Sequence, residues 1–591
     1  MHPNFPASPA TSPSGTTSGT TFRCYVEAIA DALSSHPSQP VITAADGRKV
    51  TSAELRDAVY RFARELATRG IGRGSTVALF SGNRPEVLAT RYAANLLGAR
   101  VVSLYQGMAP DALAKIARSV DTDLLVVEPG RQEAAERLVH LARPPRVYAF
   151  GPSPLGEDLL ARAARHPADP VPAAARPEDD WCIRHTGGTT GVPKGVRMPH
   201  GPYQDMLAFG SVGAGAPPRF LACTPLAHVA GNIADATLLA GGTVVLHSEF
   251  DPRDVLTAVE RERITHLWLL PPLIYRLLDH PALAATDLSS ISRISYGGCA
   301  ASASRLRRAH EVFGAVLYGG YGQSEAGAVT VIEPEEHQDL PEDGQATVGR
   351  AIPGVDIAIH DAQDGSPLPT GQVGEVRVRS GQAMTGYWRR PDLTAQVLRD
   401  GWVHTGDLGY LDEDGYLYIV DRLKDMIVVV GGHVYTHELE DLLLTHPAIA
   451  HCAVFGVRGA DATEEVHIAV VPAAGHHPEP GTLGNFVTER KGALSAPAAV
   501  HIVPDIPLTP SASPTRSGCG PCSAARARIP SADSTGSCLV PGTGQWGQRT
   551  TFTPKWLPRP RVRPMAACMW AYISMPRAAT RSPRSRMSVQ P

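Results

Sequence analysis

The sequence predicts an α/β protein with a large N-terminal domain of α/β layers, a β-rich subdomain and a small α+β domain toward the C-terminal end. Strand-like and helix-like patterns alternate from Tyr25 to about residue 349, which is typical of parallel α/β layers. After Gly349, short alternating strands are separated by Gly and Pro turns, and a compact mixture of strands and a helix follows Asp421. The chain of 591 residues also exceeds the roughly 250–300 residues at which a single core stops growing.

The N-terminal part begins with a segment expected to be disordered, because residues 1–22 are rich in Ser, Thr, Pro and Gly. Helical spacing of apolar residues then predicts a helix over Ala53–Arg69, and Thr76–Ser81 is predicted as a short buried strand ending at Gly82 and Asn83. The same alternation continues in Val101–Tyr105 with a helix over Asp111–Val120, in Leu124–Val127, in Thr243–Leu246 with a helix over Asp251–Glu262, and in His266–Leu270 with a helix that opens at Pro271.

The C-terminal part changes texture twice. Strands are predicted over Val355–His360 and Gly374–Arg379, then a helix within Val434–Leu444 and strands over Cys452–Phe455 and Val466–Val471. These changes place a large domain at residues 23–420 and a small, incomplete domain at residues 421–510. Residues 511–591 are rich in Arg, Pro and Ser and show no foldable pattern.

Composition excludes several classes of protein. The formal net charge is −3, from 55 basic and 58 acidic residues, and 43% of residues are hydrophobic, which is ordinary for a globular protein without a nucleic-acid or anionic-membrane partner. No run of 18 apolar residues and no secretory leader pattern occurs, so we expect a cytoplasmic protein without a membrane span. The nine cysteines are scattered, which favours reduced thiols over a disulfide framework or a zinc site.

One glycine- and threonine-rich stretch, Arg184–Val196, has the composition of a polyphosphate-binding loop. Glycine lets backbone N–H groups approach a phosphate closely, threonine adds hydroxyl donors, and lysine adds a mobile positive charge. The candidate phosphate-binding residues are Thr186, Gly187, Gly188, Thr189, Thr190, Gly191 and Lys194. The stretch matches neither G-x-x-x-x-G-K-[ST] nor G-x-G-x-x-G, and an ordinary surface turn is the alternative.

From about residue 25 to about residue 510 the chain resembles the adenylate-forming acyl-CoA synthetase superfamily. The resemblance rests on this loop and on an ordered set of further motifs: Pro225–Gly231, Tyr321–Gly327, Gly386-Tyr387, Thr405–Leu408, Asp421–Ile427 and Gly431-Gly432. It implies that ATP and a small carboxylic acid form an acyl-adenylate with release of pyrophosphate, and that the acyl group then passes to coenzyme A or another nucleophile. It also implies a mobile small domain, a Mg²⁺ requirement, and a monomer or homodimer.

The resemblance assigns nucleotide-binding roles by position. Tyr321 would cover the adenine face, Ser324 would donate to the α-phosphate, and Glu325 would hold Mg²⁺ together with Thr190. Asp407 would accept from the ribose hydroxyls, and Arg422 would donate to the same sugar or a phosphate. Gly298, Cys299, Gly322 and Gln323 complete the expected ATP/AMP set. A solvated surface acid is the alternative for Glu325, and a cap or turn residue for Asp407.

Three further roles follow from the resemblance. His228 would act catalytically by gating the carboxylate and the thiol channel, although a satisfied core histidine is the alternative. Lys424 would be the hinge about which the small domain rotates between half-reactions, with an exposed loop charge as the alternative. Gly431 and Gly432 would line the entry of the pantetheine arm, because only glycine leaves room there.

The chain departs from the family after Pro507-Leu-Thr-Pro-Ser511. The family continues with Gly-Lys, whose lysine stabilises charge during adenylation, whereas this chain continues Ala-Ser-Pro-Thr-Arg516. Deleting one G from GGC-AAG-CCC-GAC converts Gly-Lys-Pro-Asp into Ala-Ser-Pro-Thr, so a one-base frameshift accounts for the change. A genuine divergent tail remains the alternative. The leading function is an acid–CoA ligase, and the alternatives are an amide synthetase of secondary metabolism and an adenylation-defective homologue.

Overall fold

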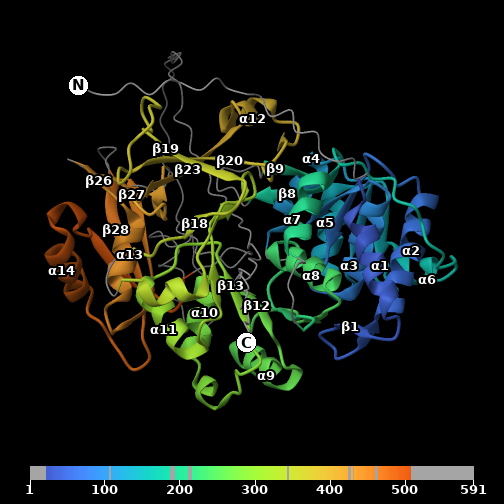
Figure 1. Cartoon of the computed structure of the whole chain (residues 1–591), viewed down its shortest axis with the longest axis horizontal. Coiled ribbons are helices and arrows are strands. Elements are labelled where there is room, and N and C mark those ends of the chain that lie inside the picture. The colour runs from blue at the N-terminus through green and yellow to red at the C-terminus, as the bar shows by residue number, and fades with distance from the viewer. Residues whose placement is uncertain are drawn as a thin grey trace, which may run out of the picture.

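The computed structural model describes residues 22–104, 108–186, 194–210, 216–341, 345–423, 427–429, 432–458 and 464–506. The structure contains two large sheets, a smaller antiparallel sheet and a C-terminal α+β unit (Figure 1). This arrangement confirms the predicted fold class. The segments predicted as a disordered N-terminus and an unfoldable tail, 1–22 and 511–591, lie outside the described residues except for Phe22.

The first large sheet has eight strands in the order β21-β9-β8-β4-β3-β5-β6-β7. Its strands from β8 through β4, β3, β5 and β6 to β7 are parallel, whereas β9 and β21 are added antiparallel at one edge. The strands are β3 (Thr76–Phe80), β4 (Arg100–Ser103), β5 (Leu124–Val127), β6 (Val147–Ala149), β7 (Glu157–Asp158), β8 (Asp180–Thr186), β9 (Lys194–Pro199) and β21 (Gly386–Tyr387).

The second large sheet has seven strands in the order β14-β13-β12-β10-β11-β1-β2. All neighbours are parallel except β1 and β2. The strands are β1 (Pro40–Thr43), β2 (Lys49–Thr51), β10 (Arg219–Ala222), β11 (Thr243–Leu246), β12 (His266–Leu269), β13 (Arg293–Tyr296) and β14 (Leu317–Gly319). The predicted strands at residues 76, 101, 124, 243 and 266 are therefore confirmed, and they pair in parallel as the alternation indicated.

Helices fill the space between the two sheets and cover their outer faces. Because side chains alternate along a strand, Val77 and Leu79 of β3 join the core shared by both sheets, whereas Ala78 and Phe80 join a separate core on the other face. The shared core includes α1 (Tyr25–Ser35), α2 (Ser52–Thr68), α3 (Pro85–Leu96), α7 (His200–Gly210) and α8 (Val229–Leu239). The outer faces are covered by α4 (Pro110–Ser119) with α5 (Gln132–Ala142), and by α9 (Pro252–Glu262), α10 (Pro271–Leu278) and α11 (Ala303–Phe313).

Local signals explain where the helices begin. Thr51 caps α2 by accepting from the backbone N–H of Glu54 at 3.2 Å, and the Glu54 carboxylate accepts from the backbone N–H of Thr51 at 2.8 Å. Proline occupies the first turn of α3, α4, α9 and α10, where its missing N–H costs no helical hydrogen bond. The predicted helices at residues 53, 111, 251 and 271 begin within one residue of these signals.

The β-rich subdomain is a five-stranded antiparallel sheet. It contains β19 (Val355–His360), β20 (Gly374–Ser380), β22 (Leu398–Arg399), β23 (Trp402–Leu411) and β24 (Leu417–Arg422), with α12 (Pro391–Val397) beside it. Two small hairpin-like pairs, β15 (Gly322–Gln323) with β16 (Gly327–Ala328) and β17 (Thr330–Val331) with β18 (Arg350–Ala351), connect it to β14. Strand β24 continues through Asp421 and Arg422, two residues past the domain boundary proposed from the sequence.

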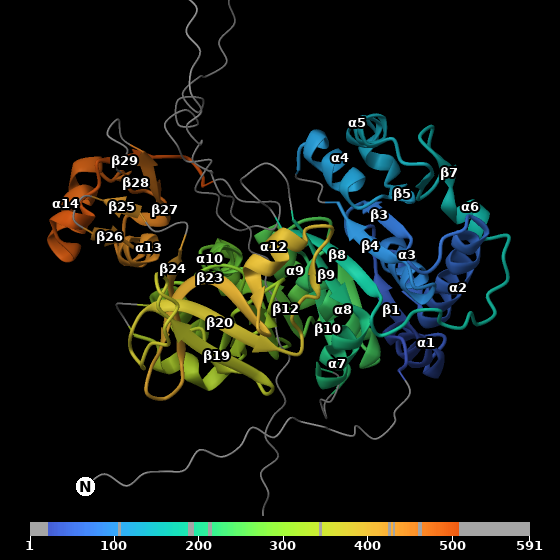
Figure 2. The ribbon, with the colours of Figure 1, turned by 90° about the horizontal axis from the view of Figure 1, so that it is seen from above.

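The C-terminal unit lies at one end of the molecule, with the N-terminal elements at the other in both views (Figures 1 and 2). It contains the β25 (Ile427–Val429) and β26 (Gly432–Val434) pair, α13 (Thr436–Leu444), the sheet of β27 (Ile449–Arg458), β28 (Glu464–Pro472) and β29 (Ala499–Ile502), and α14 (Pro480–Lys491). Its own core joins residues such as Leu443, Ile468 and Val487.

The remaining elements are short. They are α6 (Leu159–Ala163) and the 3₁₀ turns Pro129–Arg131, Pro281–Ala285, Pro334–Asp339 and Ala493–Ser495. Within the described ranges, no helix is long and apolar enough to cross a membrane. The five cysteines in these ranges are free thiols.

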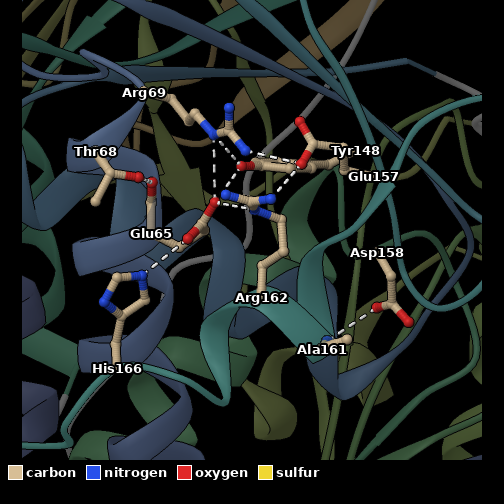
Figure 3. A network of polar contacts seen from close by, with 9 residues as sticks. All are labelled: Glu65, Thr68, Arg69, Tyr148, Glu157, Asp158, Ala161, Arg162 and His166. Atoms are coloured by element: carbon tan, nitrogen blue, oxygen red, sulfur yellow. Dashed lines mark hydrogen bonds and ion pairs between the residues drawn. The ribbon is translucent and has the colours of Figure 1, made fainter.

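A buried carboxylate, Glu65 on α2, joins that helix to the edge of the first sheet (Figure 3). It accepts hydrogen bonds from Tyr148 on β6, from Arg162 Nε on α6 at 2.7 Å, and lies 2.8 Å from His166 Nε2. Although burial alone would raise the pKa of Glu65, these partners together lower it to about 2. The ionised carboxylate therefore stabilises the folded state.

We predict that Glu65→Gln lowers the melting temperature at pH 7, because the Arg162 guanidinium loses its charged partner. Since the folded pKa of Glu65 is about 2 and its ordinary value is 4.5, the carboxylate's contribution is complete above about pH 4.5 and is lost as pH falls through 2. The difference in melting temperature between wild type and variant should narrow over that range, as measured by thermal unfolding. Glu157→Gln, which removes the half-exposed acid that also pairs with Arg162, is the control and should cost less. A constant difference across pH would contradict the assignment.

Candidate active site

The expected phosphate loop connects two neighbouring antiparallel strands. Thr186 is the last residue of β8, Lys194 is the first of β9, and the two residues are paired across the ladder. The residues between them, 187–193, lie outside the described residues and include five of the expected phosphate ligands: Gly187, Gly188, Thr189, Thr190 and Gly191. Lys194 is thus fixed at the foot of the hairpin, where β8 ends.

A tyrosine, Tyr387, contacts both Lys194 and Glu325, the expected magnesium ligand. Its Nζ lies 5.0 Å from the centroid of the Tyr387 ring, and the Tyr387 hydroxyl donates to Glu325 Oε1 at 2.8 Å. Tyr387 reaches both because β21 pairs with β9, directly beside Lys194. Burial raises the pKa of Glu325, while the Tyr387 hydroxyl and the nearby charges of Arg422 and Lys194 favour its ionised form.

A second buried carboxylate, Asp407 on β23, is the meeting point of three motifs. Its Oδ2 accepts from the Tyr321 hydroxyl at 2.6 Å and from Gln323 Nε2 at 2.5 Å, and its Oδ1 lies 2.8 Å from Arg422 Nε. Asp407 is only 2% exposed, so these partners are what make an ionised carboxylate tolerable there. Burial and, secondarily, the negative charge of Asp407 raise the pKa of Tyr321, which keeps its hydroxyl a donor.

The other adenylate-site candidates lie on the connections that follow β13 and β14. Gly298 adopts φ of 97°, which favours glycine, and begins the turn that carries Cys299. Gly322 and Gln323 form β15, and the Ser324 side chain is buried directly after it. These segments end at the same edge of the second sheet, because β13 and β14 are parallel neighbours.

His228 lies at the N-terminal end of α8, as the residue that precedes its first turn. Burial and, secondarily, the positive charge of Arg184 lower the pKa of His228 to about 3. The imidazole is therefore neutral at pH 7. Arg184 is buried near the end of β8, two residues before Thr186, so the same strand leads to both the phosphate loop and the surroundings of His228.

The connection to the C-terminal unit begins beside Asp407. Arg422 is the last residue of β24, and Lys424 and Gly431 lie outside the described residues. Gly432 begins β26 and is paired with Val429. Asp421, which is fully buried, accepts from the backbone N–H of Thr436 at 2.6 Å, so a hydrogen bond joins β24 to the start of α13.

The structure thus brings Tyr321, Gln323 and Arg422 into direct contact with Asp407, and Glu325 interacts through its charge with both Arg422 and Lys194. Two contributors are not predicted from the sequence. Tyr387 appears there only as part of a motif, without its hydroxyl contact to Glu325. The charge of Arg184 near His228 is also unforeseen, although an arginine directly after the apolar run Trp181–Ile183 is a signal that could have indicated it.

The residues present fit a nucleotide and a divalent cation. No described residue donates a well-directed hydrogen bond to Asp407 Oδ1, which leaves an acceptor for a ribose hydroxyl beside the ion pair with Arg422. Across the described residues no three His, Cys, Asp or Glu side chains gather as around a metal ion. Mg²⁺ is nevertheless commonly held by one or two carboxylates plus substrate phosphates, and Glu325 offers such a carboxylate.

Comparison with known proteins agrees with this geometry. Residues 29–388 match the family model described as AMP-binding enzyme, and residues 438–512 match the AMP-binding enzyme C-terminal domain. The chain is 35% identical over 503 residues to the medium/long-chain-fatty-acid–CoA ligase FadD8 of Mycobacterium tuberculosis, covering 81% of this chain and 87% of that protein. It is 35% identical over 468 residues to a feruloyl-CoA synthase of Amycolatopsis sp, covering 78% and 92%.

A solved structure is similar over nearly its whole length. The amide bond synthetase McbA from Marinactinospora thermotolerans superposes with a TM-score of 0.76 at 38% identity, covering 83% of this chain and 98% of that chain. The family models, the sequence relatives and the fold agree with one another. The chain therefore belongs to the AMP-binding enzyme family, the adenylate-forming acyl-CoA synthetase superfamily, and is an AMP-forming acid–thiol ligase.

Proposed function

We propose that this ligase binds ATP and Mg²⁺, joins a carboxylic acid to AMP with release of pyrophosphate, and transfers the acyl group to coenzyme A. The observation that supports this best is the buried cluster in which Asp407 meets Tyr321 and Gln323 from one other motif and Arg422 from another. Beside it, Tyr387 connects Lys194 to Glu325. The two groups together offer a carboxylate that can accept from the sugar hydroxyls, a cation that can pair with phosphate, and a carboxylate that can bind a metal.

Each group has a distinct task in the first half-reaction. Asp407 holds the ribose through its hydroxyls, and the Tyr321 ring packs against the base. Lys194 and the Ser324 hydroxyl meet phosphate oxygens, with the backbone and hydroxyls of Thr186–Gly191 around them. Glu325, with Thr190, would hold Mg²⁺, which when bound would offset phosphate charge. Gly298, Cys299 and Gly322 line the nucleotide and acyl side.

The second half-reaction uses the other candidates. A neutral His228 at the start of α8 gates the path between the carboxylate and the incoming thiol. Gly431 and Gly432 give the pantetheine arm room, and Lys424 is the pivot on which the small domain turns. The domain limits are proposed as residues 23–420 and 421–510, with the last strand of the large domain extending through Arg422.

The acceptor has one specific alternative. The similarity of 38% to an amide bond synthetase over 98% of its length supports an amine as the acceptor in place of coenzyme A. The acid is either a fatty chain or an aromatic ring, since relatives named for both classes match at the same identity of 35%. We also propose that the protein is located in the cytoplasm and that it is a monomer or a homodimer.

The direct test is ATP–pyrophosphate exchange over a panel of fatty and aromatic acids, followed by an acceptor screen. We expect exchange that requires both an acid and Mg²⁺, and product formation with coenzyme A on at least one active acid. Product with amines alone would favour the amide synthetase. Absence of exchange with every acid, also in the lysine-restored variant described below, would contradict acid activation.

We predict that Asp407→Asn raises the ATP concentration needed for half-maximal exchange by about 10- to 100-fold, because a hydrogen bond to a charged group is worth about 1.5–3 kcal/mol. Initial-rate exchange at varied ATP measures this. Asp356→Asn is the matched control, since that acid lies on β19 of the same sheet in an exposed ion pair with Arg379. An equal shift in both variants would remove Asp407 from the ribose site.

We predict that the chain as written makes acyl-AMP slowly, because the lysine expected after Ser511 is missing. Replacing Ala512-Ser513 by Gly-Lys should raise the adenylation rate by ~10²–10³, which is the usual cost of losing one preorganised charge stabiliser. Replacement by Gly-Gln is the neutral control and should give no gain. Consumption of synthetic acyl-AMP with coenzyme A should differ little among the three proteins, and equal adenylation rates in all three would refute the role of this lysine.

A further inference from the structure

Asn83, three residues after the end of β3, makes a side-chain connection between the two large sheets near His228. Its Nδ2 lies 2.9 Å from the Thr224 carbonyl oxygen, 3.0 Å from that of His247 and 3.3 Å from that of Ala222, while its Oδ1 accepts from the backbone N–H of Leu226 at 2.9 Å. Three acceptors at one end of the carboxamide and a donor at the other fix its orientation. The side chain is buried, with 8% exposed.

These contacts lie at the carboxyl ends of three parallel strands. Asn83 follows β3 of the first sheet, Ala222 ends β10 of the second, and His247 follows β11. Thr224 and Leu226 belong to the connection that leads from β10 to α8. One carboxamide therefore holds together strand ends of both sheets and the beginning of the segment that carries His228.

The other side of His228 is also held, by α3. Gly231, in the first turn of α8, lies so close to the preceding loop that an added Cβ would be 2.0 Å from the Leu226 carbonyl oxygen. Arg91 on α3 donates to the Gly231 carbonyl oxygen at 3.3 Å and forms a buried ion pair with Asp235, farther along α8. Tyr92 and Tyr203 each donate to Asp235 at 2.5 Å.

His228 is thus placed between two fixed points. Leu226, two residues before it, is held by Asn83, and Gly231, three residues after it, is held by Arg91. The backbone N–H of His228 itself donates to the Pro225 carbonyl oxygen at 3.1 Å, which closes the turn. With both ends held, the backbone of His228 has little freedom to move relative to the strand ends.

We infer that Asn83 is a positioning residue for His228: its carboxamide sets the path of the Thr224–Leu226 segment and so places the imidazole for thiol transfer. The inference rests on the proposed role of His228. Removing the carboxamide leaves the Thr224 and His247 carbonyl groups and the Leu226 N–H without this partner, so the loop moves to satisfy them. The Ala222 carbonyl oxygen still accepts from the His247 N–H. A shift of about 1 Å in a catalytic group is sufficient to cost on the order of 10²-fold in rate.

The test is a double-mutant cycle of Asn83→Ala and His228→Ala, read as the single-turnover rate of synthetic acyl-AMP with coenzyme A. Each single variant should lose at least about ten-fold. In the His228→Ala background, Asn83→Ala should cost less than about two-fold, because a residue that acts through His228 has nothing left to position. Asn83→Ser keeps one donor, and its single-turnover rate should lie between those of wild type and Asn83→Ala. If Asn83→Ala does not fold, Asn83→Ser replaces it in the cycle.

Asn95→Ala is the matched control for a loss of stability. Asn95 is fully buried on α3, donates to the Ala99 and Trp181 carbonyl oxygens at 3.0 and 2.8 Å, and accepts from the Tyr25 hydroxyl at 2.6 Å. It should lower the melting temperature as Asn83→Ala does, yet leave the single-turnover rate of folded protein within about two-fold.

The outcomes separate the two hypotheses. If His228→Ala slows thiol transfer but Asn83→Ala costs the same factor in both backgrounds, the positioning role is overturned while the role of His228 stands. A comparable rate loss in Asn95→Ala also overturns it, because the effect is then one of general stability. If His228→Ala leaves thiol transfer unchanged, the proposed role of His228 fails and the inference fails with it.

Discussion

A buried negative charge must be paired, and the pairing of Asp407 determines how the parts of this protein meet. The carboxylate is 2% exposed and collects Tyr321 and Gln323 from the segment after β14 and Arg422 from the end of β24. Leaving such a charge without partners costs several kcal/mol. The β-rich sheet is therefore joined to the parallel sheets at the point where the C-terminal unit begins, and the nucleotide site and the interdomain connection share one residue, Arg422.

The parallel topology explains why residues so far apart in sequence converge. Open α/β sheets bind ligands beyond the carboxyl ends of their strands. Here β8 ends at Thr186, β13 leads to Gly298, β14 leads to Tyr321, and β10 leads to His228. Asn83 follows β3 at the same edge and contacts the ends of β10 and β11. The helices between the sheets then set the distance between these edges, because their shared core allows little relative movement.

Much of this arrangement is predictable from the sequence, because local patterns determine the elements. The buried run Leu124–Val127 and the periodic segment at residues 53–69 are found where they are expected. The contacts of Tyr387 and Asn83 are not predictable in this way, since each joins segments whose proximity depends on the path of the whole chain. The Tyr387 hydroxyl reaches Glu325 across 62 residues, and Asn83 reaches Thr224 across 141.

The start of the C-terminal unit shows the same limit. A change of texture after residue 420 suggests a boundary there, but β24 continues to Arg422, and the buried carboxylate of Asp421 accepts from the backbone N–H of Thr436. A change in residue pattern reports the composition of a segment, whereas a domain boundary depends on which hydrogen bonds join the residues on either side of it. The backbone of Asp421 pairs with Leu408 in the β-rich sheet, and its carboxylate accepts from Thr436 at the start of α13. The connection is therefore joined to the sheet on one side and to α13 on the other.

The distribution of charge in the site bears on the missing lysine. Arg422 is paired with Asp407, and its charge is largely offset before any phosphate arrives. Lys194 lies over the Tyr387 ring, whose attraction for a cation is worth about 0.5–2 kcal/mol and does not cancel the charge. Among the described residues of this cluster, Lys194 is therefore the cation best able to meet the charge that develops on pyrophosphate. In the proposed mechanism, displacement of pyrophosphate would depend on that one side chain and a bound divalent cation, whereas thiol attack on an acyl-adenylate would develop its charge elsewhere. The two half-reactions consequently differ in how far they depend on a further lysine from the C-terminal segment.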